Sequence, residues 1–369
     1  MLLESIDVVV IGGGQAGLST GYYLRSESRK FIILDHSQEI GHSWKDRYDS
    51  LTLFTPRKYS SLPGLPLEGD PWGYPTKDEM AAYLKLYQEH FAIPVQLETE
   101  VRRLSYAMGR FLITTNKGTW LAQQVVVATG PFQTPFIPPF AQSLSPEVFH
   151  IHTADYRNVE MLPEQGEVLV IGGGNSGAQI ALEISQKKQV YLSVGHHIQY
   201  LPYRLLGRSL FWWYERIGLL RKSPKSWIGR RFIKKKDPLY GFDLRMAIAS
   251  GTVKLLNRAT SASGRLVSFA DGSFQKPSTI IWATGFRADY PWICIPEVFD
   301  HNQTVIHERG VTWIPGLYFV GLPWQSSRGS ALIGWVHRDA RFISGMIAQY
   351  GERYANEDNS YEDLSSHGS

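Results

Sequence analysis

The chain has 369 residues, of which 43% are hydrophobic and 20% charged, proportions that are typical of a globular protein with two or three domains. Its formal net charge of +4 argues against a general affinity for polyanions, so we expect no nucleic-acid partner. The single cysteine, Cys294, excludes an internal disulfide framework and a C-x-x-C redox centre. Because it lies between Ile293 and Ile295, we expect Cys294 to be buried in the core.

The N-terminus leads directly into a predicted strand, without a basic segment followed by a long apolar one. We therefore expect no signal peptide and a cytoplasmic protein. Residues 310–327 are uncharged, but Pro315, Pro323 and several glycines interrupt them, so a membrane span is not expected. The histidines are scattered without a carboxylate or cysteine at ligand spacing, so no metal site is expected.

The first predicted unit is a strand, a glycine-rich turn, a helix and a second strand, all within residues 7–35. The apolar run at residues 8–11 is typical of a buried parallel strand. Glycines at G-x-G-x-x-G spacing follow, which allow a tight turn, the approach of a pyrophosphate and close helix packing: Gly12, Gly14 and Gly17. The second strand ends at Asp35, where a carboxylate can accept the hydroxyls of an adenosine ribose.

Residues 167–195 repeat this pattern, with a second set of glycines at the same spacing: Gly172, Gly174 and Gly177. Here the second strand ends at Ser193, and His196 and His197 follow it without an acid. A carboxylate favours a free ribose 2′-hydroxyl and would repel a 2′-phosphate. The first site therefore fits FAD, and the second fits NADPH or either nicotinamide nucleotide.

Between the two units lie a loop, a helix and a linker. Residues 50–74 form a long loop rich in Pro, Gly and aromatic residues, which either lines a flavin or patches the core from the surface. A helix is predicted over residues 76–90, with Thr76 and Glu79 at capping-box spacing. Residues 131–166 contain several prolines and are the expected linker.

The segments 112–130 and 266–285 resemble each other, since both contain two strands around a Gly turn and end in Ala-Thr-Gly. This predicts an internal duplication and an α/β fold with two Rossmann-like dinucleotide-binding domains, the second inserted in the first. The expected division is 1–155 and 283–356 for the FAD-binding domain, 156–282 for the NAD(P)H-binding domain and 357–369 for a disordered tail.

An unusual stretch follows the second motif. The aromatic run at residues 210–214 precedes eight basic residues with no acid between them, from Arg221 to Lys236. One interpretation is an anionic partner, which would be a membrane surface, the phosphates of NADPH or an acidic protein. The other, which the nearly balanced total charge favours, is a solvated helical excursion with its aromatic side chains packed inward. The sequence is compatible with a monomer or a homo-oligomer.

Several short segments complete the pattern, namely 41–44, 128–130, 152–157, 283–287, 321–325 and 328–330. With them the sequence resembles the class B flavin-dependent monooxygenases, in particular the small bacterial flavin-containing monooxygenases and their plant auxin-forming relatives. The resemblance implies flavin contacts at Gly12, Gly14, Gln15, Ala16, Gly17, Asp35, Ser43, Trp44, Val101, Thr129, Gly130 and Gln325. It implies nicotinamide-nucleotide contacts at Gly172, Gly174, Asn175, Ser176, Gly177, Ser193, His196 and His197.

The chain departs from the family pattern at four places. The F-x-G-x-x-x-H signature is matched only at its histidine, His152, which is either a functional residue or a linker residue bonded to backbone. His42 replaces the second glycine of the G-G-x-W segment. Phe54 stands where animal members have an Asn that supports the oxygenated flavin, and a phenyl ring cannot donate a hydrogen bond. His196 and His197 stand where NADPH-specific members often have Arg, which predicts mixed use of NADPH and NADH.

The resemblance implies a monooxygenase. NAD(P)H would reduce the flavin, the reduced flavin would capture O₂ as a C4a-(hydro)peroxide, and one oxygen atom would pass to a small soft nucleophile or carbonyl compound. No catalytic side chain is assigned. The alternatives are a non-oxygenating reductase or oxidase, which passes electrons to a quinone, a carrier or O₂, and a non-catalytic flavin-binding sensor or membrane-docking protein. The loop at residues 50–74, with Trp324 and Trp335, is the expected substrate pocket.

Overall fold

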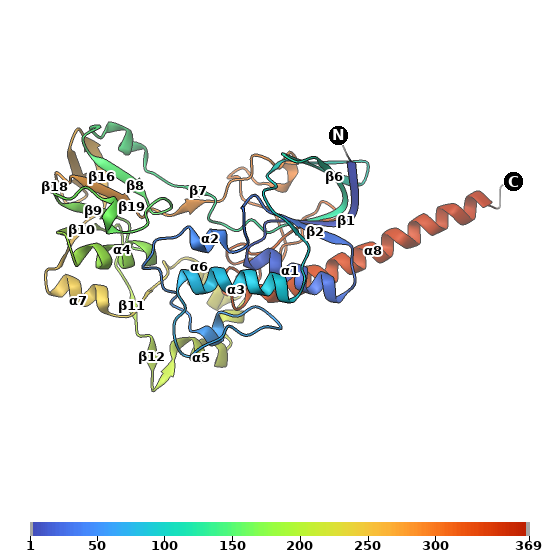
Figure 1. Cartoon of the computed structure of the whole chain (residues 1–369), viewed down its shortest axis with the longest axis horizontal. Coiled ribbons are helices and arrows are strands. Elements are labelled where there is room, and N and C mark those ends of the chain that lie inside the picture. The colour runs from blue at the N-terminus through green and yellow to red at the C-terminus, as the bar shows by residue number, and fades with distance from the viewer. Residues whose placement is uncertain (1–2, 367–369) are drawn as a thin grey trace.

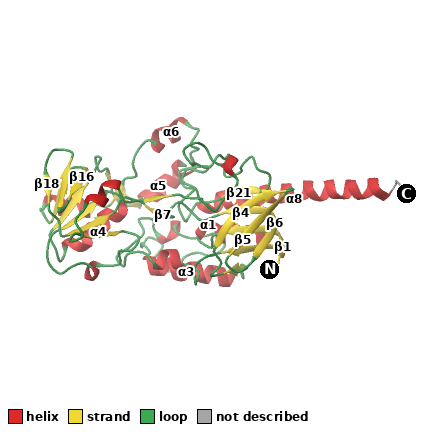
Figure 2. Cartoon of the chain, turned by 90° about the horizontal axis from the view of Figure 1, so that it is seen from above, coloured by secondary structure: helices red, strands yellow, loops and turns green. Residues whose placement is uncertain are grey.

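The computed structural model describes residues 3–366, with side chains for residues 4–352. Two sheets lie at opposite ends of the body, and strand β7 (Thr134–Pro135) lies between them (Figure 1). Seen from above, the strands around β6 lie next to helix α8 and those around β18 lie at the far end (Figure 2).

The first sheet has the strand order β3-β2-β1-β6-β5-β4, and β21 also pairs with β6. Its strands are β1 (Leu3–Ile11), β2 (Phe31–Leu34), β3 (Val95–Gln96), β4 (Val101–Ala107), β5 (Arg110–Thr115), β6 (Thr119–Val127) and β21 (Leu317–Phe319). Strand β1 is parallel to β2 and β6, and its apolar residues 8–11 are buried, as expected for a central parallel strand. Because β21 returns to β6 from beyond the second unit, the predicted insertion of one unit within the other is confirmed.

The second sheet is entirely parallel, with the order β15-β10-β9-β19-β8. Its strands are β8 (Phe149–His152), β9 (Val168–Ile171), β10 (Val190–Ser193), β15 (Val253–Leu256) and β19 (Thr279–Trp282). Beside it lies an antiparallel sheet of β16 (Ala259–Ser263), β17 (Leu266–Phe269) and β18 (Phe274–Gln275). The predicted fold class, α/β with two Rossmann-like units, is confirmed.

Strand β8 lies within residues 1–155 but pairs with β19 of the second sheet. The two crossings between the units are β7 and β20 (Phe286–Arg287), which pair antiparallel with each other. We therefore propose that the units divide at these two strands. The first boundary then lies at residues 134–135, whereas the sequence placed it after residue 155.

Five helices of the described residues pack against the sheets: α1 (Gln15–Ser26), α3 (Lys77–His90), α4 (Asn175–Ser185), α7 (Asp243–Ala249) and α8 (Val336–Ser366). Helices α1, α3 and α8 share one apolar core, which includes Leu24, Leu84 and Ile343. The predicted capping box of α3 is confirmed, because Thr76 accepts from the N–H of Glu79 and the Glu79 carboxylate accepts from that of Thr76. Five short 3₁₀ segments also occur: η1 (Arg57–Tyr59), η2 (Pro139–Ser143), η3 (Val159–Met161), η4 (Leu219–Arg221) and η5 (Pro296–Val298).

The segment between β10 and β15 carries small elements: β11 (Tyr200–Leu201), β12 (Arg204–Leu205), β13 (Arg208–Ser209), α5 (Leu210–Arg216), α6 (Trp227–Ile233) and β14 (Leu239–Tyr240). Part of its aromatic run packs inward, because Phe211 is buried against Leu220 and Trp335. Among the helices of residues 3–366, none has both the length and the apolar character needed to cross a membrane.

Two sequence expectations differ from the structure. Helix α8 continues through Ser366, where disorder was expected from residue 357, and its end projects from the body (Figure 1). Glu357, Glu362 and Leu364 in this segment favour a helix, which a polar composition alone does not reveal; residues 367–369 lie outside the described range. Cys294 was expected to be buried but is exposed, because its neighbours Ile293 and Ile295 face the core and the residue between them points outward.

Candidate active site

The first glycine turn is shaped as a phosphate cradle. Gly12 has φ +106°, and a Cβ there would lie 2.8 Å from the carbonyl oxygen of Ala128, so only glycine fits. A Cβ at Gly17 would collide with the carbonyl of Gly12. At Gly14, by contrast, a Cβ would meet nothing within 4 Å, which leaves open space before the N-terminus of α1. Free N–H groups facing open space fit a pyrophosphate.

Asp35 stands at the entrance of this cradle. Its Oδ2 accepts from the N–H of Gly13 at 2.5 Å and its Oδ1 from the N–H of Ser37 at 2.8 Å, and the side chain is 12% exposed. The N–H of Thr99 donates to the carbonyl of Asp35, which brings the start of β4, with Val101, to the same edge of the sheet. A fixed carboxylate beside a phosphate cradle fits the adenosine ribose of FAD.

The other predicted flavin residues surround this edge. Gln133 donates to the Thr129 hydroxyl at 3.0 Å and to the carbonyl of Gly130 at 2.7 Å, which fixes the turn after β6. The Gln15 amide donates to the carbonyl of Ala331 at 3.4 Å. A Cβ at Gly321 would lie 2.9 Å from that of Ala16. The C-terminal segment therefore packs on the first turn of α1, as the flavin interpretation requires.

Helix α2 (His42–Lys45) follows a left-handed glycine. Gly41 has φ +89°, and a Cβ there would collide with the backbone of Ala81. The conformational freedom of glycine is thus needed at Gly41, whereas His42 begins the helix and its Nε2 lies 2.9 Å from Asp46. Ser43 is exposed and Trp44 packs on the core of the first unit.

Gln325 is buried, and both hydrogens of its amide are committed to backbone. They donate to the carbonyl of Phe319 at 2.8 Å and to that of Arg309 at 3.2 Å, while its oxygen accepts from the N–H of Leu322. Its side chain braces the turn after β21 and leaves no free N–H for a flavin.

The second glycine turn repeats the geometry of the first. Gly172 has φ +125° against the carbonyl of Ala283, Gly177 faces Gly172, and Gly174 opens on free space at the N-terminus of α4, where Asn175 and Ser176 begin the helix. This cradle fits a second pyrophosphate.

Tyr48, from the first unit, lies beside the second cradle. Its hydroxyl donates to Oε1 of Gln179 at 2.9 Å and shares a hydrogen bond with the Ser176 side chain. Burial raises the pKa of Tyr48 to about 12, so the phenol stays neutral. One hydrogen-bonded side chain therefore connects the two units at the nucleotide site.

The end of β10 differs from what the sequence suggested. Ser193 is buried, and its hydroxyl donates to the carbonyl of Asn257 and accepts from the N–H of Ala259, so it is not presented to a nucleotide. His196 and His197 are exposed just beyond the strand.

Two cations lie at the same place: Arg258, which the sequence analysis did not single out, and Lys236, from the basic run for which NADPH phosphates were one expected partner. A Cβ at Gly195 would lie 2.5 Å from Nε of Arg258, so that guanidinium covers the turn after β10. Burial, and then the charges of Lys236 and Arg258, lower the pKa of His196. His196 is therefore neutral at pH 7, and the positive charge comes from Lys236 and Arg258, which we call the cationic cluster. This cluster fits the 2′-phosphate of NADPH, since an Arg fork binds phosphate in a bidentate manner.

His152 is buried at the crossing between the units. Its Nε2 donates to the carbonyl of Gly285 at 3.0 Å, and its Nδ1 accepts from the N–H of Ala154 at 3.0 Å, partners that assign the neutral tautomer. Burial lowers its pKa. These contacts match the backbone-bonded linker histidine that the sequence left as an alternative. The ring of Phe286 packs against His152 and under the guanidinium of Arg47.

Aromatic side chains from the loop at residues 50–74 meet those of α5 and β14. Phe54 stacks with Tyr240 at 5.0 Å and with Phe211 at 6.0 Å; we call these three the aromatic cluster. Beside it, Tyr59 stacks on Trp335 at 5.7 Å. The loop therefore contributes one side of an aromatic interior.

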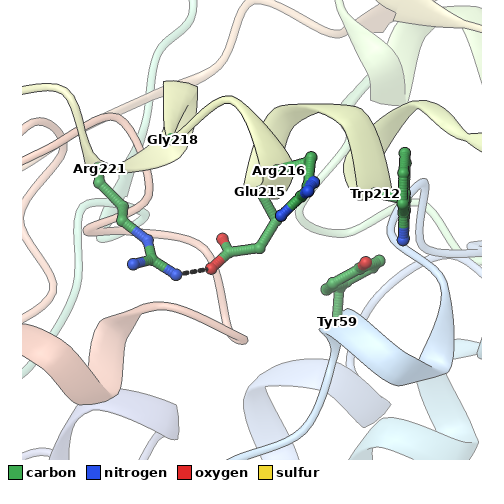
Figure 3. Close-up of a pocket in the computed structure, with 6 residues that line it drawn as sticks. All are labelled: Tyr59, Trp212, Glu215, Arg216, Gly218 and Arg221. Carbon is green, nitrogen blue, oxygen red and sulfur yellow. Dashed lines mark hydrogen bonds and ion pairs between the residues drawn. The ribbon is translucent and has the colours of Figure 1, made fainter.

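A cleft of about 400 Å³ opens next to this cluster (Figure 3). It is lined by Tyr59, Trp212, Glu215, Arg216, Gly218 and Arg221. Glu215 pairs with Arg221, and its other oxygen accepts from Nε1 of Trp335 at 2.8 Å. The cleft thus combines an aromatic side with a fixed carboxylate and arginines. The other expected pocket residue, Trp324, has a left-handed backbone, with φ +59°.

Two Rossmann-like units, each with a phosphate cradle, one beside a carboxylate and one beside cations, define a class of oxidoreductases that pair a flavin with a nicotinamide nucleotide. The chain belongs to the family described as pyridine nucleotide-disulphide oxidoreductase, which it matches over residues 9–200. With a single cysteine, it has no internal pair for disulfide chemistry.

Individual relatives make the comparison finer. An uncharacterized oxidoreductase called CzcO-like, from Geobacillus kaustophilus, is 52% identical over 94% of this chain and 99% of the relative. The probable indole-3-pyruvate monooxygenase YUCCA1 of Arabidopsis thaliana is 28% identical over 92% of this chain and 89% of its own length. The solved flavin-containing monooxygenase of Stenotrophomonas maltophilia is 29% identical, with a TM-score of 0.79 over 94% of this chain and 99% of that one. The predicted resemblance to the class B flavin monooxygenases and their plant branch is confirmed, and the protein is an enzyme.

Proposed function

We propose that this enzyme is an FAD-dependent monooxygenase that takes electrons from NADPH and transfers one atom of O₂ to a small soft nucleophile or carbonyl compound. The observation that carries the proposal is the unequal pair of cradles, with Asp35 beside the first and the cationic cluster beside the second. The names of relatives at 28% and 29% identity support the oxygenase class.

The chain's own residues bind and orient. The N-terminus of α1 would hold the pyrophosphate of FAD, and Asp35 its adenosine ribose. When bound, FAD supplies the acceptance of hydride from the reductant and the delivery of electrons to O₂. The N-terminus of α4 would hold the NADPH pyrophosphate, while Tyr48 keeps Ser176 in place from the neighbouring unit.

The cationic cluster points to NADPH as the preferred reductant. The sequence predicted weak discrimination, because only imidazoles follow β10 in the chain. Arg258 brings a guanidinium to that position from beyond β15, and Lys236 adds a second permanent charge. Because only NADPH carries a 2′-phosphate, a guanidinium and an ammonium group at this position favour NADPH over NADH.

The aromatic cluster Phe54, Phe211 and Tyr240 excludes water from the interior beside the cleft of Figure 3. We propose that cleft as the substrate entrance. Its aromatic side and its Glu215 and arginines suit a small molecule with an apolar body and one polar group.

The test is the fate of oxygen. The FAD-loaded enzyme is supplied with NADPH, ¹⁸O₂ and a simple aryl sulfide or ketone, and NADPH consumption is compared with labelled product and with hydrogen peroxide. Labelled product in near-stoichiometric yield supports a monooxygenase. Peroxide equal to NADPH consumed, with no oxygenated product across a panel of sulfides and ketones, contradicts it.

The second candidate is a reductase or oxidase that inserts no oxygen. The observation that favours it is Phe54, whose ring stacks in the aromatic cluster and offers no hydrogen-bond donor where animal relatives have Asn. Its signature is immediate return of the oxidised flavin spectrum when the reduced enzyme meets O₂, with no transient species.

A further inference from the structure

Positive charge is concentrated in one segment of the chain. Residues 198–242 contain eleven Lys or Arg and two acids, whereas the rest of the chain has 27 and 32. The segment is therefore net +9 and the remainder net −5, a separation that the total of +4 hides. Most of these cations face solvent. A protein with its charge distributed so unevenly turns its positive segment toward an anionic surface.

The hairpin of β12 and β13 exposes apolar side chains within this segment. Its two-residue turn is Leu206-Gly207, with φ +51° and +73°. This is the turn in which Asn-Gly is preferred, so Leu206 occupies a left-handed position that aliphatic residues avoid. Leu206 is 81% exposed, and Leu205 beside it is also exposed. The hairpin projects from the body in Figure 1.

The hairpin lies between two arginines, and a hydrogen bond from α5 fixes its position. Arg204 and Arg208 are both exposed, and neither forms an ion pair with an acid of the described residues. The indole N–H of Trp213 donates to the carbonyl of Leu205 at 2.9 Å, and Arg208 lies over the Trp212 ring. The leucine tip is thus presented in a fixed position between two arginines.

A second apolar group lies on α6, which projects from the edge of the body in Figure 2. Trp227 is 77% exposed at its first residue, and Ile233 is exposed at its last. Arg230, Arg231, Lys234 and Lys235, all exposed, supply cations next to them in the chain. Indole beside Lys and Arg is the composition of segments that lie at a membrane–water interface.

An exposed apolar residue at the tip of a turn does not by itself indicate membrane binding. Met108-Gly109, between β4 and β5, has the same turn geometry, with φ +50° and +74°, and Met108 is fully exposed. That turn belongs to the part of the chain with net negative charge. The Met108 hairpin has arginines of its own, Arg103 and Arg110 among them. Leu206 differs because it lies in a segment of net charge +9 that also exposes Trp227, and this combination suits a lipid surface.

We propose that residues 198–242 dock the enzyme on a membrane surface rich in anionic phospholipid, with Leu206 inserted among the acyl chains and the surrounding Lys and Arg bound to headgroups. Nucleic acid would use the cations but leave the leucine in water. The inference does not depend on the redox chemistry proposed above.

The experiment is flotation of the full FAD-loaded chain with vesicles of phosphatidylcholine alone, or of equal parts phosphatidylcholine and phosphatidylglycerol, at low and high salt. We expect binding to the anionic vesicles only, weakened by salt. L206N is the informative variant, because Asn suits the turn and should not impair folding. It should weaken binding about tenfold, whereas the matched control M108N should not change it. Lys234→Glu with Lys235→Glu should weaken binding more than tenfold, at about fivefold for each charge removed.

Absence of binding to the anionic vesicles at low salt would overturn the proposal. So would equal binding by L206N and M108N, because the hairpin would then have no part in docking. A third outcome would identify the cations as a nucleic-acid surface instead. In that case a single-stranded RNA oligomer displaces the protein from vesicles, and L206N binds the vesicles as well as the parent does.

Discussion

The guanidinium of Arg258 lies against the backbone of Gly195, near enough that a Cβ on the glycine would be 2.5 Å from Nε. The two residues are adjacent because β15 pairs parallel with β10, so the chain segments that leave both strands emerge at the same edge. That edge lies beside the open cradle at Gly174. A nucleotide bound there would meet Arg258 at its adenosine end.

The first prediction concerns this arginine. Arg258→Ala should lower kcat/KM for NADPH by about tenfold to a hundredfold, because one charge-assisted contact to phosphate is worth roughly 1.5–3 kcal/mol. The value for NADH should change little, since NADH has no 2′-phosphate. The Kd of NADP⁺, measured by titration, should rise in parallel.

The control for this prediction is Arg265→Ala, which removes an exposed guanidinium elsewhere in the same unit, 3.8 Å from Glu147. It should leave both reductants unaffected. Equal losses with NADPH and NADH in the Arg258 variant would mean that the arginine supports the fold of the turn and does not read the phosphate.

The contrast between Ser193 and Arg258 shows what the sequence could reveal. Both dinucleotide motifs are local patterns in which strand, glycines and helix follow within thirty residues, and the structure has them where they were predicted. The partner at the strand end is not local. Ser193 was chosen by its position in the chain, whereas Arg258 reaches the same edge only through the pairing of β15 with β10.

Cys294 is a different kind of error. Its position between two buried isoleucines indicated burial, but alternation in an extended segment predicts the opposite for the middle residue. The two isoleucines that flank Cys294 therefore indicate an exposed cysteine. By contrast, nothing in the sequence linked Tyr48 with Ser176, because that contact depends on how the two units sit together.

The second prediction tests the first cradle. Asp35→Ala removes a carboxylate that accepts from the N–H groups of Gly13 and Ser37, so the turn should loosen and the ribose should lose its partner. We expect the purified protein to retain less FAD, with the Kd raised at least about tenfold. The measurement is flavin absorbance per protein, followed by titration with FAD.

Asp300→Ala is its matched control, because Asp300 also accepts from two backbone N–H groups, those of Asn302 and Thr304, in a loop away from the cradle. It should keep full flavin content. If both variants lose flavin equally, general destabilisation and not ribose binding explains the effect.

The third prediction concerns Phe54. Its ring is half-buried and stacks on Tyr240 and Phe211, so Phe54→Asn removes this packing and leaves an amide in an apolar setting. The free energy of unfolding should fall by about 2 kcal/mol, and by about 1 kcal/mol in Phe54→Leu, which keeps an apolar side chain. Chemical denaturation measures both. An Asn variant as stable as the parent would show that the stack contributes nothing.

The last prediction is a pH dependence that originates at His152. Burial lowers its pKa, and the charge of Arg47 acts in the same direction, while the carbonyl of Gly285 and the charge of Asp155 oppose them. The folded state therefore binds a proton less readily than the unfolded state, in which the pKa is about 6.5. Its stabilising contribution is complete above that pH and is lost as the pH falls toward the lower folded value.

His152→Gln isolates this contribution, because an amide can donate to one backbone partner and accept from the other without titrating. Between pH 7.5 and 5.5, the free energy of unfolding of the parent should decline, and the variant should decline less steeply, by at most about 1.4 kcal/mol per pH unit. Burial also lowers the pKa of His307 and His337, so part of the slope should persist. His301→Gln, at an exposed histidine, should keep the parent's slope. Parallel curves for the parent and the His152 variant would mean that this imidazole is not the group whose protonation opposes folding.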